Sequence, residues 1–544
     1  MRMRFSTKKI TTRYLLLAIT SCIIFFVFSR YLSDEDSILA FAGGGHSASR
    51  FKETVGTYLF RKTPAQKVVE KLEISTLPNG TYSKISFINR RQIYSVGDML
   101  VVKITLYDST GTRIRRGGDR LRIVLIETKL RANVNGKIID NGDGTYTGTV
   151  LLPWRGTPKL VVLLSIPRQV HDTVVDAVNE YGTMRFIMGI FSKTTDNITI
   201  SERTPCGPLP MIKGFDNLYN MTKMVYNMPW YCVKPKSVEL TAKHWKQSVT
   251  ATNFTLPFNV TRILLAHQHK PILNWIFVKV EGAESLMRTS RTPCHKRSRE
   301  KTWEVGTSGF YYNNNWVNIN CTNQYKQTPS QYAKCLAGRH LVLIGDSNIR
   351  SYLEFFTKFL HLNITIGNPA DHAPGLVFGY NSARSISATW RPHGVPYFAA
   401  FPYNKNVSHS HIIDSRPLNM ESDNRTIVVI HLWAHFLAIP IHIVEERIRD
   451  VRKAVERLLT RAPNVTVVIK GPQSHLENQI YLQVDFKRVS FEQIWRHEFK
   501  HLRKEVIYLD YWDITTGSLS KHLHPSRTVL KDMINTFINH VCDV

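Results

Sequence analysis

Apolar and polar positions alternate in two different ways along the chain, and the change falls near residue 300. From about residue 67 to residue 191, short runs rich in β-branched residues (100–106, 121–126 and 160–165) are separated by polar turn clusters. Residues 140–146 read Asp-Asn-Gly-Asp-Gly-Thr-Tyr, and Asn-Gly and Asp-Gly pairs favour tight β-hairpins. This pattern predicts an immunoglobulin-like β-sandwich over residues 67–200.

Beyond the predicted sandwich, residues 201–300 carry cysteines and prolines with little periodicity, and we expect a cysteine-containing extension there. From about residue 302 the pattern becomes one of strands alternating with helices. Apolar runs at 341–344, 426–430, 465–469 and 506–509 predict buried strands. Helices are predicted around 444–458, 491–502 and 528–540, where apolar residues recur every three or four positions. Residues 301–544 are therefore expected to form an α/β domain with a parallel sheet between helices.

A Gly345-Asp346-Ser347 sequence ends the first of these strands and precedes a helix. A serine in this position lies at a helix N-terminus, where unpaired backbone N–H groups can hold an oxyanion. Glycine suits the tight turn because a larger side chain would crowd it. Ser347 is therefore a candidate nucleophile for acyl transfer, and an ordinary N-cap serine is the alternative.

A His524-Pro525 pair stands near the C-terminus, ahead of the last predicted helix. Together with Gly345-Asp346-Ser347, it resembles the first and last sequence blocks of the SGNH/GDSL acyl-ester hydrolases, in their PC-esterase branch. The whole chain resembles the neurexophilin and PC-esterase domain (NXPE) family. The resemblance implies that Ser347 is the nucleophile and His524 the general base.

One position departs from the family pattern. The last block is described as Asp-x-x-His, but Lys521 occupies the place of the aspartate, and a cation cannot accept the imidazole N–H. Asp513, which follows the last predicted strand, is our choice for the orienting carboxylate, with Asp510 as the alternative. A Ser-His dyad and a non-catalytic site also remain open.

Other residues are assigned around the nucleophile. Gly345, His435 and Arg350 are the predicted oxyanion and substrate-binding residues. His435 stands where the SGNH pattern has an asparagine and can donate a hydrogen bond in its place. Arg350 suits a carboxylate or phosphate of the substrate, or an acid of the fold. Further oxyanion donors are the Ser347 backbone N–H and a glycine of a middle loop, Gly375 or Gly379.

The N-terminal segment predicts a membrane anchor. The predicted anchor covers residues 14–31, of which 14–29 are mostly apolar. The preceding tail (1–13) is basic and Asp34-Glu35-Asp36 follows, which places the bulk of the chain in the lumen. The apolar length of about 24 Å suits a thin early-secretory membrane, so we expect a Golgi type II protein with a stem over 32–66. The competing interpretation is a cleaved signal peptide, with a secreted form after Ala42.

Cysteines and sequons agree with a lumenal location. Six cysteines follow the anchor, and an even number in an oxidising compartment predicts three disulfides of open connectivity. These candidates are Cys206, Cys232, Cys294, Cys321, Cys335 and Cys542. Glycosylation sequons occur at Asn79, Asn197, Asn220, Asn253, Asn259, Asn320, Asn363, Asn406, Asn424 and Asn464.

Charge and histidine usage limit the expected partners. The formal net charge is +29, which favours a polyanionic partner such as a sialylated or sulfated glycan. The lumenal location disfavours nucleic acid. No metal site is expected, because no Cys-x-x-Cys pair occurs and the histidines of 267–269 and 409–411 are interpreted as surface residues.

Two functions are compatible with these features. The first is a lumenal glycan O-acyl transferase or esterase, with acetyl as the favoured acyl group and an acyl-serine intermediate. It has no bound cofactor, although acetyl-CoA is a candidate acyl donor. The second is a catalytically inactive, neurexophilin-like glycoprotein that acts in binding or adhesion.

Overall fold

The computed structural model describes residues 74–181, 187–250, 268–272, 276–286, 291–368, 376–395, 408–415, 425–437, 439–476 and 484–542. The predicted tail, anchor and stem lie outside these residues, as do the sequons at Asn253, Asn259, Asn406 and Asn424. Among the described residues, no helix is long and apolar enough to cross a membrane. The elements that build the site belong to the larger of two compact units of the chain.

Two sheets in the first half share one core. The first has the strand order β1-β3-β7-β6, and the second has the order β15-β9-β4-β5-β18-β19 with β16 also on β9. Buried residues of both sheets, such as Val102 and Val162, belong to a single hydrophobic cluster. Three of these strands match the runs predicted at 100–106, 121–126 and 160–165. The strand bounds are β1 Lys84–Phe87, β3 Met99–Thr105, β4 Arg120–Glu127, β5 Ala132–Asn135, β6 Lys137–Asp140, β7 Thr145–Leu151, β9 Lys159–Ile166, β15 Lys270–Pro271, β16 Ile276–Phe277, β18 Gly309–Tyr312 and β19 Asn315–Asn318.

Local turn chemistry places the β6–β7 hairpin where the sequence predicts it. Asp140 pairs with Tyr146 across the turn, and Gly142 and Gly144 adopt φ values of 83° and 79°. Glycine tolerates this left-handed conformation without a Cβ clash. A helix in the same region, α3 (Arg168–Tyr181), was not predicted.

Strand pairing crosses the domain boundaries expected at residues 200 and 300. β15 and β16 come from the predicted extension yet pair with β9, and β18 comes from the predicted esterase domain yet pairs with β5. Conversely, β10 (Ile187–Thr195) comes from the predicted sandwich but pairs with β14 (Trp245–Thr250) of the predicted extension, in a separate sheet. The reason is that a sheet edge needs hydrogen-bond partners, and these need not be close in sequence.

The separate sheet has five strands, and a further sheet has three. The five-stranded order is β12-β13-β11-β10-β14, with β11 Ile198–Gly207, β12 Leu218–Asn220 and β13 Tyr231–Val233. The three-stranded order is β2-β17-β8, with β2 Tyr94–Ser95, β8 Trp154–Gly156 and β17 Val280–Ser285. Short helical turns complete this half: η1 Ile74–Thr76, η2 Thr222–Val225, η3 Ala242–His244, η5 Cys294–Lys296 and η6 Arg299–Trp303.

The second half is built on a seven-stranded sheet of order β21-β22-β23-β20-β24-β25-β26. The run from β23 to β26 is parallel, and β21 and β22 add an antiparallel edge. From β20 the chain builds toward β23 and then returns to β24 on the other side, so the strand order reverses beside β20. Ligands of open α/β sheets bind outside the carboxyl ends of the strands at such a point. The bounds are β20 His340–Gly345, β21 Asn363–Ile366, β22 Val377–Asn381, β23 Ile386–Arg391, β24 Thr426–His431, β25 Thr466–Lys470 and β26 Val506–Leu509.

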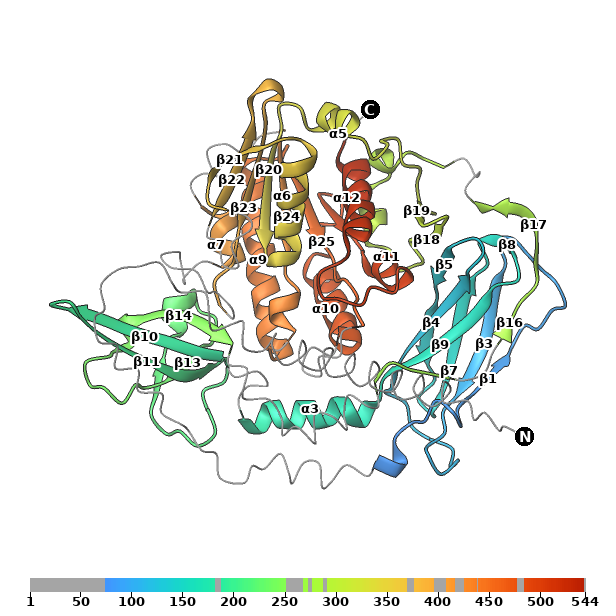
Figure 1. Ribbon diagram of the computed structural model, residues 1–544, viewed down its shortest axis with the longest axis horizontal. Helices are drawn as coiled ribbons and strands as arrows, with labels where there is room; N and C mark the ends of the chain where they lie inside the picture. Colours follow the sequence, from blue (N-terminus) through green and yellow to red (C-terminus); the bar gives the residue numbers. More distant parts are fainter. Residues whose placement is uncertain are drawn as a thin grey trace, which may run out of the picture. The chain divides into compact units, whose positions relative to one another are not determined.

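Helices cover both faces of this sheet (Figure 1). Side chains of β20 alternate between two clusters: Val342 and Ile344 pack with α9 and α10, whereas Leu341 and Leu343 pack with α6 and α12. This alternation follows from the two-residue period of a strand buried on both sides. The helix bounds are α5 Pro329–Leu336, α6 Ser347–Phe359, η7 Ser382–Arg384, α7 His409–Ile413, η8 Ala434–Phe436, α9 Ile441–Arg461, α10 Val484–Glu498, α11 Trp512–Gly517 and α12 Arg527–Val541.

The six cysteines that follow the predicted anchor form three disulfides, as predicted. The pairs are Cys206–Cys232, Cys294–Cys321 and Cys335–Cys542. The last pair joins α5 to the residue that follows α12, across a sequence separation of 207 residues. It therefore ties the start of the α/β region to its end.

Candidate active site

Ser347 is the first residue of α6, directly after the end of β20. The N-cap is Asp346, whose carboxylate accepts the Asn348 N–H at 2.8 Å, so Ser347 is not the N-cap that we considered as the alternative. The Asp346 carbonyl accepts the next two helical N–H groups. Within the described residues, the Ser347 backbone N–H has no acceptor, as expected for the first N–H of a helix. It is the donor left for an oxyanion.

Gly345 shapes the turn that carries the nucleophile. Its φ is 144°, and a Cβ at this position would overlap the carbonyl oxygen of His431 on β24. Gly345 pairs with His431 in the strand register, so the two strand ends approach too closely for a side chain. The role of Gly345 is thus to set the backbone path, rather than to contact the substrate with a side chain.

Ser347 and His524 form a hydrogen-bonded pair. The Ser347 Oγ lies 2.7 Å from the His524 Nε2, although the two residues are 177 positions apart in sequence. Ser347 is half-buried and His524 is exposed at the end of the loop that precedes α12. If the serine hydroxyl donates, Nε2 is unprotonated and Nδ1 carries the imidazole hydrogen. This is the arrangement in which an imidazole can accept the serine proton during nucleophilic attack.

Neither predicted acid contacts His524. Asp513 is fully buried, and its carboxylate accepts Asn135 Nδ2 at 2.8 Å and the Ser308 N–H at 2.8 Å, with Lys137 Nζ at 3.6 Å. Asp510 accepts the Trp512 N–H instead. Within the described part of the chain, no carboxylate hydrogen-bonds the His524 ring. Our assignment of Asp513 as the orienting acid is therefore wrong, because donors from distant segments occupy both of its oxygens.

Residues 316–542 match the family model for the NXPE family member 4-like C-terminal domain. The match contains both Ser347 and His524. This part of the chain is similar to the C-terminal domain of the NXPE family. This similarity suggests a PC-esterase-like acyltransferase or esterase.

Inside the matched region, Asp346 joins the nucleophile turn to the segment after β24. Its second oxygen accepts the Ala434 N–H at 3.0 Å, and its first lies 3.8 Å from the His431 Nε2. Burial alone would raise the pKa of Asp346, but His431, His435 and the hydrogen bond from the Asn348 N–H lower this pKa well below its usual range. Asp346 is therefore ionised and holds the two strand ends together.

Histidines surround this carboxylate. The predicted oxyanion donor His435 is half-buried, and its Nδ1 lies 2.9 Å from the His393 Nε2, so it contacts another imidazole of the fold. His393 in turn stacks on His409, with ring centroids 5.0 Å apart. His409 is fully buried, and the prediction that it lies on the surface is wrong. Burial lowers the pKa of His409 to about 4 and that of His431 to about 3.

The other predicted site residues either lie away from the dyad or pair with other residues of the fold. Arg350 donates from Nε to Glu354 at 2.9 Å, one helical turn further along α6, which was the structural alternative for this residue. Gly379 pairs with Ala388, which pairs with Leu341 near the start of β20, so this glycine is remote from the strand ends. Gly375 lies outside the described residues.

His269 was also assigned to the surface, but it is only half-exposed. Its Nδ1 lies 3.2 Å from the Ser165 Oγ on β9. Burial lowers the pKa of His269 to about 4. A neutral, partly buried imidazole in a hydrogen bond is a structural residue of the first half. The side chains of His267 and His411 lie outside the described set.

Two polar residues beside the dyad were not predicted. Gln473, in the loop after β25, donates to the Asn348 side chain at 2.8 Å and to the Leu523 carbonyl at 3.0 Å. Lys470 donates to Gln473 at 2.7 Å, and burial lowers the pKa of Lys470 to about 7. Both lie at or just beyond the carboxyl end of a predicted strand, so their position was the signal that could have identified them.

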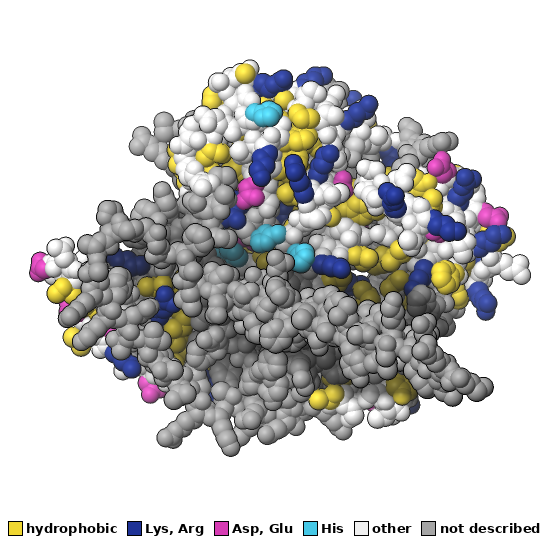
Figure 2. Space-filling view, viewed as in Figure 1, with side chains coloured by type: hydrophobic (Ala, Val, Ile, Leu, Met, Phe, Trp, Pro, Cys, Tyr) yellow, Lys and Arg dark blue, Asp and Glu magenta, His cyan; other side chains and the backbone are white. Residues whose placement is uncertain are grey.

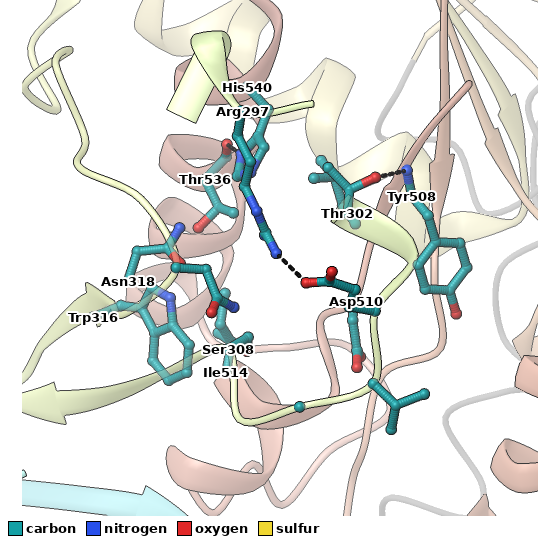
Figure 3. Close-up of a pocket in the computed structure, with 15 residues that line it drawn as sticks. Arg297, Thr302, Ser308, Trp316, Asn318, Tyr508, Asp510, Ile514, Thr536 and His540 are labelled. Atoms are coloured by element: carbon teal, nitrogen blue, oxygen red, sulfur yellow. Dashed lines mark hydrogen bonds and ion pairs between the residues drawn. The ribbon is translucent and has the colours of Figure 1, made fainter. Parts of the chain in front are cut away.

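The alternative acid candidate, Asp510, lines a cavity that the dyad does not share. Asp510 borders a space of about 110 Å³ with Arg297, Trp316 and His540 (Figure 3), and neither Ser347 nor His524 contributes to its lining. His540 also lies near the sulfurs of Cys294 and Cys321. Because these two cysteines form a disulfide, their sulfurs are not available as thiolate ligands for a metal ion.

Proposed function

We propose that the NXPE-like region catalyses acyl transfer to or from glycan hydroxyl groups, with acetyl as the acyl group and acyl-Ser347 as the intermediate. The observation that carries this proposal is the 2.7 Å contact between the Ser347 Oγ and the His524 Nε2. The contact lies at a helix N-terminus beside the point of the sheet where the strand order reverses.

The reaction proceeds in two balanced steps. The Ser347 Oγ attacks the acyl carbonyl carbon while its proton passes to the His524 Nε2, and the Ser347 N–H stabilises the oxyanion. The bond to the leaving group then breaks, the leaving group takes the proton from Nε2, and acyl-Ser347 remains. In the second step His524 removes a proton from water or a sugar hydroxyl, whose oxygen attacks the acyl carbon. The bond between this carbon and the Ser347 Oγ then breaks, the Oγ takes the proton back from Nε2, and the acid or the ester is released. Water gives an esterase, and a sugar hydroxyl gives a transferase.

Charge supports an acidic glycan as the acceptor. Lysines and arginines exceed acids by 29 in the whole chain, and Figure 2 shows them scattered over the displayed face. A positive surface attracts sialylated or sulfated sugars over several ångströms. We propose in addition a Golgi location with a single N-terminal anchor and lumenal domains, and acetyl-CoA as a candidate acyl donor. Five of the sequons at described positions have an exposed asparagine, which is compatible with glycosylation: Asn197, Asn220, Asn320, Asn363 and Asn464.

A fluorophosphonate probe tests this proposal, because it phosphonylates serines activated by a neighbouring base. We expect the purified full chain to be labelled, and Ser347→Ala and His524→Ala to lose the labelling. An acetyl-ester reporter should be hydrolysed by the wild type and by neither variant. Absence of labelling in folded wild-type protein would refute the enzymatic function.

The second candidate is a binding glycoprotein without catalysis. Its supporting observation is the absence, within the described residues, of a carboxylate on the His524 ring, together with Lys521 at the family's aspartate position. An imidazole without an orienting acid is a weaker base than that of a complete triad. This candidate predicts a folded, unlabelled protein that binds acidic glycans with equal affinity before and after Ser347→Ala.

A further inference from the structure

Gln473 links the two loops that carry the nucleophile and the base. Its side chain is 1% exposed, and its Nε2 donates to the Asn348 Oδ1 at 2.8 Å and to the Leu523 carbonyl at 3.0 Å. Asn348 directly follows Ser347, and Leu523 directly precedes His524. One amide therefore holds the neighbours of both reacting residues at a fixed separation.

The orientation of this amide is unambiguous. The Leu523 carbonyl can only accept, so it must contact Nε2, and Lys470 then donates to the Gln473 Oε1 at 2.7 Å. If the amide were flipped, its NH₂ group would face the Lys470 Nζ, and its oxygen would face the Asn348 Oδ1 and the Leu523 carbonyl oxygen. The Gln473 backbone is also held, because its carbonyl accepts the Trp433 Nε1–H at 3.1 Å. Gln473 is thus fixed at both its side chain and its main chain.

His524 needs such support from a neighbour. It is exposed, and among the described residues its ring has a single hydrogen-bond partner, the Ser347 hydroxyl. In a complete triad an aspartate would fix the ring through Nδ1. Here the adjacent backbone is fixed instead, by a buried donor that reaches the carbonyl of the preceding residue.

We propose that Gln473 is a positioning residue that fastens the His524 loop to the start of α6, in a site where no carboxylate of the described residues hydrogen-bonds the imidazole. This inference rests on the proposed function, because it concerns the geometry of the same serine and histidine. Gln473 does not touch the reacting atoms, and its effect is on how often the Ser347–His524 contact is formed. Small displacements of reacting groups cost up to about 100-fold in rate, so the expected effect is large.

Gln473→Glu is the informative substitution. It preserves the length of the side chain and an acceptor for Lys470, but an ionised carboxylate cannot donate to Asn348 or Leu523. Gln473→Ala removes all three bonds. Gln327→Ala is the matched control, because Gln327 is a half-buried glutamine of the same domain whose Nε2 donates to the Asp532 carboxylate at 3.0 Å.

The full chain is treated with a fluorophosphonate, and both the rate constant and the final labelled fraction are measured. We expect Gln473→Glu to reach the wild-type labelled fraction with a rate constant about 10- to 100-fold lower, and to lower kcat for an acetyl-ester reporter with KM unchanged. Gln327→Ala should label at the wild-type rate. A purely structural role would instead reduce the labelled fraction and the melting temperature while leaving the rate constant of the folded molecules unchanged.

Two results would overturn the inference in distinguishable ways. If wild type labels at Ser347 and Gln473→Glu labels at the same rate, the positioning role is refuted and the proposed function stands. If folded wild type is not labelled, the proposed function fails and the inference falls with it. If Gln473→Glu does not fold, Gln473→Ala is judged by the same two measurements.

Discussion

Asp513→Asn separates the two roles that this residue could have had. As an orienting acid it would act on the rate, with a loss on the order of 10⁴-fold when the carboxylate becomes an amide. The structure gives it a different role. Asp513 on α11 accepts hydrogen bonds from Asn135 and Ser308 and lies near Lys137, so it joins α11 to segments that are far away in sequence. We expect the substitution to lower stability rather than the rate of the chemical step.

The magnitude follows from the contacts. An asparagine keeps one acceptor oxygen, but its NH₂ group faces the donors of Asn135 or Ser308, and the Lys137 charge loses its partner. Removing one member of a buried, charge-paired set costs about 3–5 kcal/mol in the free energy of unfolding. For a domain of this size the loss corresponds to a fall in melting temperature of roughly 10 °C.

The pH dependence of this contribution has a definite sign. Burial alone would raise the pKa of Asp513, but Lys137, Asn135 and Ser308 lower this pKa on balance. A carboxylate with a lowered pKa stabilises the fold above the pKa of the unfolded chain, about 4, and this contribution is lost as the pH falls through the folded value. The difference between wild type and Asp513→Asn should therefore be complete at pH 6–7.

The assay combines a thermal melt with the fluorophosphonate labelling rate at a temperature at which both proteins are folded. Asp510→Asn is the matched control, because an asparagine at this position can still accept the Trp512 N–H. It loses only the ion pair with Arg488 at 3.9 Å, so we expect the wild-type labelling rate and a smaller fall in melting temperature than in Asp513→Asn. Asn135→Ala should reproduce the stability loss from the other side of the contact. A wild-type melting temperature with a labelling rate about 10⁴-fold lower in Asp513→Asn would refute our reasoning and restore the triad.

Three further predictions follow from other residues. Gly345→Ala should abolish fluorophosphonate labelling, because its Cβ would overlap the His431 carbonyl oxygen; wild-type labelling would contradict the close strand approach. Arg122→Ala should lower the free energy of unfolding, measured in urea, by about 3–5 kcal/mol, because it leaves the Asp485 carboxylate buried without its partner at 2.6 Å; an unchanged midpoint would contradict it. His409 and His431, with folded pKa values of about 4 and about 3, are neutral when folded. Between pH 7 and pH 5 these two histidines take up protons in the unfolded chain but not in the folded chain. Each of them should therefore lower the free energy of unfolding by about 2 kcal/mol over this range, and urea midpoints that do not change with pH would refute this.

The strands and helices of the second half could be predicted from the sequence because their patterns are local. The strand at 506–509 has the predicted bounds, and the helix predicted at 528–540 differs from α12 by one residue at each end. Period-two and period-3.6 patterns depend only on which face of each segment is buried. The strands β21 to β23 were not predicted, although β23 is a direct neighbour of β20.

The hydrogen-bond partners of polar side chains could not be predicted from the sequence in the same way. Asp513 and Asp510 both follow a strand, as an orienting acid should. Nothing in the sequence shows that Asn135 and Ser308, rather than His524, donate to the Asp513 carboxylate. Gln473 carries no motif, and its importance comes only from reaching the neighbours of Ser347 and His524. The assignment of His409 to the surface failed for the same reason, because burial of a polar residue depends on what packs over it.

The sequence alone determined that a serine follows a buried strand at a helix N-terminus and that a histidine-proline pair precedes the last helix, and the resemblance to a family connected the two. The tertiary structure decided that they meet, which strands pair across the expected domain boundaries, and which donors hold each carboxylate. The physical reason is that periodicity and turn chemistry act over a few residues, whereas a hydrogen-bond partner is selected by distance in space among side chains hundreds of positions apart.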